Sequence, residues 1–142
     1  MFESDFNLVD IFKQTKHIAL IGASNKEDRA SYRVMRFLLN SGYQVYPVNP
    51  VLVDEKILGQ PVYADIKSIP VQVDMVDVFR QSIYLYDIIE QAVSSRVKIV
   101  WTQLGVTDEK AEMLAKHNQI QMVVDKCPAI ELPRLKALGF IP

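Results

Sequence analysis

Apolar residues are spaced along this chain in two ways, as short continuous runs and as stripes with a helical period. The continuous runs are bounded by polar or glycine-bearing segments, a pattern typical of strands that are covered on both faces in a parallel sheet. Residues 58–63 add a turn and a further short strand. The five main strands are therefore predicted at residues 17–21, 44–48, 73–79, 98–102 and 121–124.

The amphipathic stripes between these runs predict helices. The first helix is expected over residues 4–14, and the second begins at about Ser31. Local end signals place the other three, because hydroxyl side chains favour the first position before a helix and proline favours its first turn. We expect Ser82 and Thr107 to cap the third and fourth helices, and Pro133 to start the last one.

The order of these elements predicts the fold class. A strand, a helix and a second strand within residues 17–48 have the length that a right-handed parallel crossover requires. Repetition of this unit predicts an α/β fold, a single Rossmann-like three-layer sandwich with a mostly parallel sheet of about five strands. Because 142 residues is the size of one domain, we expect residues 1–142 to form a single domain.

Composition excludes several functional classes. Sixteen basic and seventeen acidic residues give a net charge of −1, which disfavours binding to nucleic acid through a broad positive field. No apolar stretch reaches the roughly 18–20 residues of a membrane span, and the start MFESDFNLVD has no basic, apolar leader pattern, so we expect a cytoplasmic protein. With one cysteine, Cys127, and two separated histidines, no disulfide or metal site is expected.

Ligand chemistry is expected where the parallel strands end. In an open parallel sheet the ligand crevice lies outside the carboxyl ends of the strands. The loops that follow the five strands are all polar or contain glycine, and they lie at residues 22–25, 49–50, 79–80, 103–105 and 125–127.

The first of these loops favours phosphate binding but departs from the nicotinamide dinucleotide fingerprint. That fingerprint needs glycines spaced G-x-G-x-x-G and an acid about 20 residues later, whereas this chain has Gly22, Ser24 and Glu27, and then Asn49. NAD would lack its ribose contact, although NADP stays possible. A phosphate cradle of another shape is predicted from the Ser24 hydroxyl, the loop N–H groups and the start of the Ser31 helix. Nearby cations that could contact phosphate are Lys26, Arg29 and Arg33.

Other chemically distinctive residues allow two interpretations each. Trp101 is expected in the core, with stacking on a ligand as the alternative, and Phe79 has the same ambiguity. Cys127 is expected to be a small buried apolar group, with a mixed disulfide as the alternative. Asp74 and Asp77 would face opposite sides of a strand, so they do not form a catalytic pair. We expect Asp77 to pair with a cation or a loop N–H group.

Taken together, six segments in this order resemble the small bacterial CoA-binding domain proteins. That family is similar to the amino-terminal domain of the succinyl-CoA synthetase alpha subunit, and the resemblance extends from about His17 to Leu135. The segments are Ile21-Gly22-Ala23-Ser24, Arg29-Ala30-Ser31-Tyr32-x-Val34, Val45-Tyr46-Pro47-Val48-Asn49-Pro50, Val73-Asp74-x-Val76-Asp77-Val78-Phe79-Arg80, Val100-Trp101-Thr102-Gln103-Leu104-Gly105 and Val124-Asp125-Lys126-Cys127.

The resemblance implies a site for coenzyme A (CoA) or an acyl-CoA at the carboxyl ends of the strands. It implies phosphates at the first loop, the nucleotide beyond the second strand and pantetheine near residues 103–105. Thr102 and Leu132 depart from the family pattern, which more often has an apolar residue and a histidine there. The residues implied or predicted for the cofactor are Gly22, Ala23, Ser24, Lys26, Arg29, Ser31, Val48, Asn49, Pro50, Phe79, Arg80, Gln103 and Gly105.

Three functions are compatible with the sequence. The favoured one is binding of CoA or acyl-CoA without catalysis, because no catalytic constellation is visible in the residues. The second is an enzyme, either a nucleotide-dependent oxidoreductase or the CoA-binding subunit of an acyl-CoA synthetase. The third is a protein-interaction module that keeps the fold without the ligand. A partner protein and a homo-oligomer are both compatible with these functions.

Overall fold

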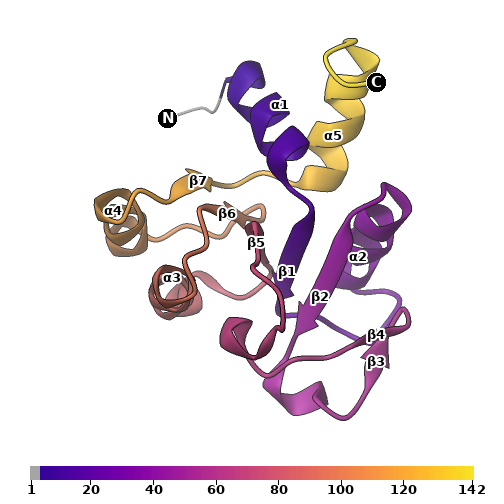
Figure 1. Ribbon diagram of the computed structural model, residues 1–142, viewed down its shortest axis with the longest axis vertical. Coiled ribbons are helices and arrows are strands. Elements are labelled where there is room, and N and C mark those ends of the chain that lie inside the picture. Colours follow the sequence, from indigo (N-terminus) through magenta and orange to yellow (C-terminus); the bar gives the residue numbers. More distant parts are fainter. Residues whose placement is uncertain (1–3) are drawn as a thin grey trace.

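A five-stranded parallel sheet runs through the centre of the protein, seen in a computed structural model that describes residues 4–142 (Figure 1). All four strand pairings in this sheet are parallel, which confirms the predicted α/β sandwich. Residues 1–3 of the predicted single domain lie outside the described part. In the sheet order β2-β1-β5-β6-β7, the strands are Gln44–Val48, His17–Ile21, Met75–Val78, Ile99–Thr102 and Gln121–Val123.

Helices cover both faces of the sheet and complete the three layers (Figure 1). The helices α1 (Asp5–Gln14), α2 (Ala30–Asn40) and α5 (Pro128–Ala137) pack on one face. The other face is covered by α3 (Leu85–Ser94) and α4 (Glu109–His117). None of the described helices is long and apolar enough to span a membrane.

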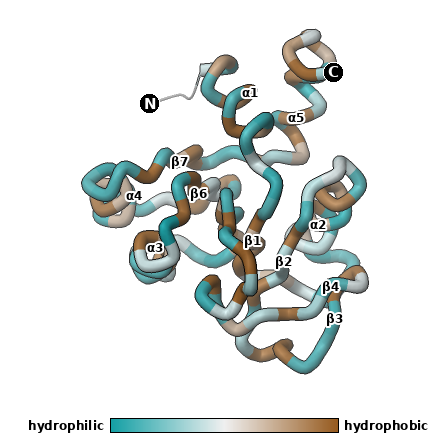
Figure 2. Tube along the Cα trace, viewed as in Figure 1, coloured by the Kyte–Doolittle hydropathy of each residue, from teal (hydrophilic) through white to brown (hydrophobic). Residues whose placement is uncertain are grey.

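Hydrophobic residues sit where this layering requires them. Figure 2 shows hydrophobic positions concentrated along strand β1, whereas the helices alternate between hydrophobic and hydrophilic positions. Ile18 and Leu20 contribute to the core on the α1, α2 and α5 side, while Ala19 and Ile21 contribute to the other core. Alternate side chains of one strand therefore fill both cores, which explains why the strand is continuously apolar.

Local signals set several element boundaries as expected. The Ser4 hydroxyl accepts a hydrogen bond from the Asn7 N–H at 3.2 Å and caps α1, so the predicted helix over residues 4–14 is confirmed. The predicted turn after the second strand is a small antiparallel hairpin of β3 (Lys56–Ile57) and β4 (Gln60–Pro61).

The predicted caps of the third and fourth helices were wrong by two residues and one residue respectively. Ser82 opens a short 3₁₀ turn before α3 begins, and its hydroxyl accepts a hydrogen bond from the Thr107 N–H at 3.0 Å. The cap of α4 is Asp108, whose carboxylate accepts from the Ala111 N–H at 2.9 Å. Ser82 and Thr107 therefore connect two crevice loops instead of capping α3 and α4.

The start of α5 was also predicted incorrectly, because Pro133 lies inside this helix. The helix begins at Pro128, where a missing N–H group is harmless, and continues through Pro133. Leu132 and Leu135 are buried in the core on either side of this proline. Tertiary packing thus offsets the loss of one helical hydrogen bond.

Candidate functional site

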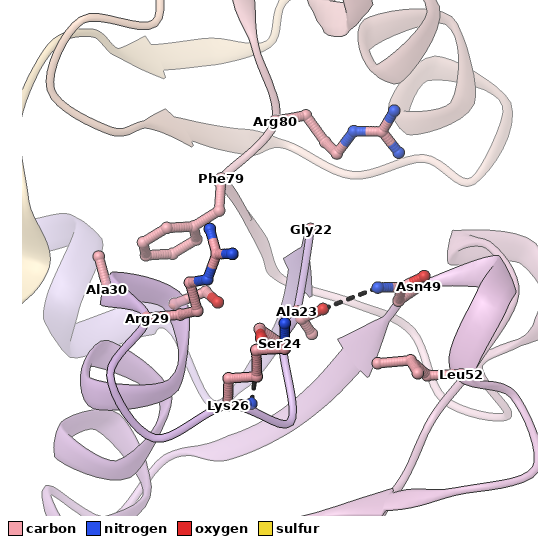
Figure 3. Close-up of a pocket in the computed structure, with 11 residues that line it drawn as sticks. Gly22, Ala23, Ser24, Lys26, Arg29, Ala30, Asn49, Leu52, Phe79 and Arg80 are labelled. Carbon is pink, nitrogen blue, oxygen red and sulfur yellow. Dashed lines mark hydrogen bonds between the residues drawn. The ribbon is translucent and has the colours of Figure 1, made fainter.

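A cavity of about 470 Å³ opens at the carboxyl ends of β1, β2 and β5 (Figure 3). Its wall combines the loop after β1, the first turn of α2 and the residues that follow β2 and β5. This is the edge of the sheet where the sequence predicts a crevice. The lining residues are Gly22, Ala23, Ser24, Lys26, Arg29, Ala30, Ser31, Asn49, Leu52, Phe79 and Arg80.

The backbone conformation at Gly22, which lines this cavity, requires a glycine. Its φ is +88°, a conformation that other residues adopt only with strain. A Cβ at this position would lie 3.0 Å from the carbonyl carbon of Phe79 and 3.1 Å from its oxygen. The contact between two strand ends therefore explains the glycine, so Gly22 alone does not identify a ligand site.

The loop after β1 is held in place by the end of β2. The Val48 carbonyl accepts hydrogen bonds from the N–H groups of Gly22 at 3.1 Å and Ala23 at 3.2 Å. The Asn49 side-chain amide donates to the Ala23 carbonyl at 2.9 Å, and its oxygen accepts from the Val51 N–H at 3.0 Å (Figure 3). Both ends of the Asn49 side chain are thus used within the protein.

The first turn of α2 presents unused hydrogen-bond donors to the cavity. Arg29 is the residue before the helix, and its side chain makes no capping hydrogen bond. The first N–H groups of any helix have no partner within the helix, and the macrodipole makes this end partly positive. Ala30 and Ser31, from this first turn, line the cavity. The arrangement favours an anion such as a phosphate group.

Two exposed cations from the loop add positive charge to the same cavity. Lys26 and Arg29 both line it, and neither forms an ion pair within residues 4–142. The Ser24 hydroxyl accepts from the Lys26 N–H at 3.1 Å, which tightens the loop around the cavity. Arg33, the other predicted cation, points elsewhere, since its guanidinium donates to the Asp28 carbonyl at 2.7 Å.

The two residues after β5, Phe79 and Arg80, occupy different parts of the crevice. Arg80 extends away from the loop in Figure 3, and its guanidinium lies 4.0 Å from the centre of the Tyr84 ring. This cation–π contact holds the arginine at the rim of the cavity. The preceding Phe79 lines this cavity and also a second one.

The second cavity has a volume of about 460 Å³ and lies between α2, the loop after β6 and the start of α5. It shares Ala30 and Phe79 with the first cavity. Most of its other side chains are apolar. The full lining is Ala30, Arg33, Val34, Phe79, Gln103, Leu104, Val106, Cys127, Ala129 and Ile130.

Gln103 lines this second cavity and also forms a hydrogen bond with a buried carboxylate, that of Asp77. Its side-chain amide donates to Oδ1 of Asp77 at 2.7 Å, while Oδ2 of this fully buried aspartate has no hydrogen-bond partner within the described residues. Burial raises the pKa of Asp77 to about 7, and the Gln103 hydrogen bond opposes this shift. The expectation of a cation or loop N–H partner for Asp77 was therefore wrong.

Most of the predicted cofactor residues line one of the two cavities, but three do not. Val48 is buried and contributes its carbonyl to the loop, while Pro50 is exposed at the start of a short 3₁₀ turn. Gly105 is exposed in the loop after β6, where its N–H donates to the Asp125 carboxylate.

Sequence reasoning also missed some lining residues, notably Leu52, Ala129 and Ile130. Leu52 follows β2 inside a short turn that no periodicity marks. Ala129 and Ile130 belong to the first turn of α5, so the incorrect start of that helix hid them. Pro128 was the sequence signal that could have revealed the true start of α5, because proline favours the first turn of a helix.

The other residues singled out in the sequence are buried in the fold. Trp101 is fully buried, as expected for the core, and its indole N–H donates to the Lys126 carbonyl at 2.8 Å. Burial raises the pKa of the Cys127 thiol, which favours its neutral form. Thr102 is buried, and its hydroxyl accepts from the Asp125 N–H at 3.1 Å, so a polar residue is accommodated in the strand.

Comparison with known proteins adds an independent observation. Residues 16–133 match the family model described as a CoA binding domain. The chain is 30% identical over 124 residues to the protein YneT of Bacillus subtilis, covering 87% of this chain and 90% of YneT. A solved structure of a hypothetical protein from Pyrococcus horikoshii superposes with a TM-score of 0.91 at 34% identity, covering 94% and 93% of the two chains.

Part of the chain is also similar to a much larger protein. It is 31% identical over 107 residues to the alpha subunit of an ADP-forming acetate–CoA ligase I from Pyrococcus furiosus. The matched region covers 68% of this chain but only 23% of that subunit.

Proposed function

Because this chain belongs to the CoA-binding domain family, we propose that it binds CoA or an acyl-CoA in the crevice at the carboxyl ends of the strands, without catalysis of its own. The observation that carries the proposal is one cavity lined by a helix amino terminus, a polar loop and the cations Lys26 and Arg29.

The chemistry of this cavity fits the phosphates of CoA. Backbone N–H groups at the start of α2 can hydrogen-bond the diphosphate, and the loop cations can offset its charge. Arg80 supplies a third cation at the rim. In a chain of net charge −1, this local concentration of positive charge favours a polyanionic ligand.

A nicotinamide dinucleotide fits the same cavity less well. The residue after β2 is Asn49, and both of its polar side-chain atoms already hold the protein backbone. It therefore does not present the carboxylate that accepts hydrogen bonds from the ribose of NAD. An oxidoreductase is disfavoured for this reason.

The ligase similarity favours one second candidate function. This chain would then supply CoA to a catalytic partner chain, as one part of an acyl-CoA ligase. The matched segment corresponds to less than a quarter of the ligase subunit, so the remaining parts of such an enzyme would have to come from other chains.

Calorimetric titration with CoA and dephospho-CoA tests the proposal. We expect CoA to bind, and Arg29→Ala to weaken it roughly ten- to hundredfold, since one charge-assisted contact contributes about 1.5–3 kcal/mol. Dephospho-CoA lacks the 3′-phosphate, so we expect it to bind more weakly than CoA to the unmodified protein.

Arg36→Ala is the matched control, because Arg36 lies on α2, the helix that Arg29 precedes, and is outside the cavity with its guanidinium over the Tyr32 ring. This variant should bind CoA like the unmodified protein. Absence of CoA binding to the unmodified protein would contradict the proposal. Equal losses in both variants would show that Arg29 makes no specific contact.

A further inference from the structure

Gln103 has one side-chain atom that the protein leaves without a partner. Its backbone N–H donates to the Val78 carbonyl at 3.3 Å, and its backbone carbonyl accepts from the Val106 N–H at 3.0 Å. Its side-chain Nε2 donates to Oδ1 of Asp77 at 2.7 Å. No group within the described residues donates to the side-chain oxygen, Oε1. This oxygen is therefore the side-chain acceptor that remains for a ligand.

The Oε1 atom of Gln103 can be reached from the second cavity. Gln103 is only 9% exposed, and it lines that cavity. Among residues 4–142, Oδ2 of Asp77 is the only completely buried side-chain oxygen or nitrogen without a hydrogen-bond partner. Oε1 also lacks a partner, so it is not completely buried and opens to the cavity that Gln103 lines. A ligand N–H group that enters this cavity would find an acceptor already in place.

Asp77 determines which end of the Gln103 amide faces the cavity. It lies fully buried on β5, and above its pKa of about 7 its carboxylate has no proton to donate. The Gln103 group turned toward it must then be the NH₂ group. A reversed amide would place the Gln103 oxygen against a buried negative charge, losing the hydrogen bond and adding repulsion. The buried carboxylate thus keeps Oε1 directed to the cavity.

We propose that Gln103 accepts a hydrogen bond from an amide N–H group of the pantetheine arm of CoA, and that Asp77 is the positioning residue for this contact. The inference rests on the proposed function, in which the first cavity holds the phosphates. The arm continues from the diphosphate of CoA, and the second cavity adjoins the first through Ala30 and Phe79. The arm contains two amide groups separated by methylene groups.

The rest of the wall suits the other parts of such an arm. An amide presents a carbonyl oxygen besides its N–H group, and Gln103 satisfies only the N–H group. Arg33 and Ala129, which belongs to the first turn of α5, line the same cavity. The partly positive amino end of a helix favours a carbonyl oxygen. Val34 and Val106 are buried in the wall, where they can contact the methylene groups between the amides.

Calorimetric titration with CoA and with adenosine 3′,5′-bisphosphate measures the contribution of the arm. The second ligand keeps the adenosine and the 3′-phosphate but lacks the arm. At about pH 8.5, above the pKa of Asp77, Gln103→Met and Asp77→Leu should each weaken CoA binding roughly two- to tenfold, the effect of one lost hydrogen bond. Both variants should bind adenosine 3′,5′-bisphosphate like the unmodified protein.

A double variant shows whether Asp77 acts through Gln103. With both substitutions the protein should bind CoA as Gln103→Met alone does, because Asp77 has no amide left to orient in that background. Gln91→Met is the matched control. Gln91 also donates to an aspartate, Asp87, at 2.9 Å, but it lies on α3 and outside both cavities. This variant should bind CoA like the unmodified protein.

Two CoA analogues test the same contact from the side of the ligand. Each has an ester oxygen in place of one of the two amide N–H groups of the arm. The unmodified protein should bind one analogue roughly two- to tenfold more weakly than the other, whereas Gln103→Met should bind both alike. The analogues test the contact in the unmodified protein, so the result does not depend on whether Asp77→Leu folds.

The outcomes separate this inference from the proposed function. Unchanged CoA affinity in Gln103→Met, or equal affinities of the unmodified protein for CoA and both analogues, would overturn the contact while leaving CoA binding intact. Further weakening by Asp77→Leu in the Gln103→Met background would overturn the positioning role of Asp77. Failure of CoA to bind to the unmodified protein would overturn the proposed function and this inference together.

Discussion

Asp77 shows how a single buried residue couples the fold to pH. It lies fully buried on the central strand β5, with the Gln103 amide as its hydrogen-bond donor. Removal from water disfavours the charged carboxylate, which is why burial raises its pKa to about 7 from the ordinary aspartate value of 3.8. The folded protein therefore holds a proton that the unfolded chain releases between these two pH values.

The contribution of Asp77 to the stability of the protein should fall as the pH rises from about 4 to about 7. In this window Asp77 keeps its proton in the folded state and loses it in the unfolded state, so its contribution to the free energy of unfolding declines by up to about 1.4 kcal/mol per pH unit. The neutral Asp77→Asn variant lacks this dependence, so its stability relative to the unmodified protein should increase across the window and level off above pH 7. Urea denaturation of both proteins at pH 4, 5.5, 7 and 8.5 measures the difference. A difference that stays constant with pH would contradict this account.

At the scale of elements, the crevice depends on how the end of β2 holds the loop after β1. Asn49 connects them through its hydrogen bond to the Ala23 carbonyl. Asn49→Ala should destabilise the protein by about 1–3 kcal/mol and weaken CoA binding, because it leaves the Ala23 carbonyl without this donor and loosens the loop.

Asn25→Ala is the matched control for this loop. Asn25 donates to the exposed Glu55 side chain at 2.9 Å and does not line the cavity. Its replacement should change stability by less than about 0.5 kcal/mol and leave CoA affinity unaltered. Urea denaturation and calorimetric titration of both variants provide the comparison, and equal effects would contradict a special role for Asn49.

The positions of the strands and helices were predicted better than the exact residues at which the helices begin. Strands were found because residues such as Ile18 and Leu20 form continuous apolar runs that a two-sided core requires. Helix starts were less predictable where a polar side chain forms its hydrogen bond with a distant loop and not with the helix that follows it. The hydroxyl of Ser82 suits a helix cap, but it binds the Thr107 N–H from another loop, a contact between residues distant in the sequence.

At the scale of the whole molecule, parallel strands bring the predicted loops to one edge of the sheet. Topology alone therefore gathers Ser24, Asn49 and Phe79 around one cavity, as the sequence predicts. The second cavity was not predictable in the same way, because part of its wall comes from α5. The position of Ala129 and Ile130 depends on how this helix packs across the sheet.

The measurement that tests the central claim most directly is thermal unfolding of the purified protein with CoA and, separately, with NAD. A ligand present at 100 times its dissociation constant stabilises the folded state by about 2.7 kcal/mol, which should raise the Tm on the order of 10 °C. The account predicts such a rise with CoA and no rise with NAD at the same concentration. Equal rises with both ligands, or a rise with NAD alone, would contradict it.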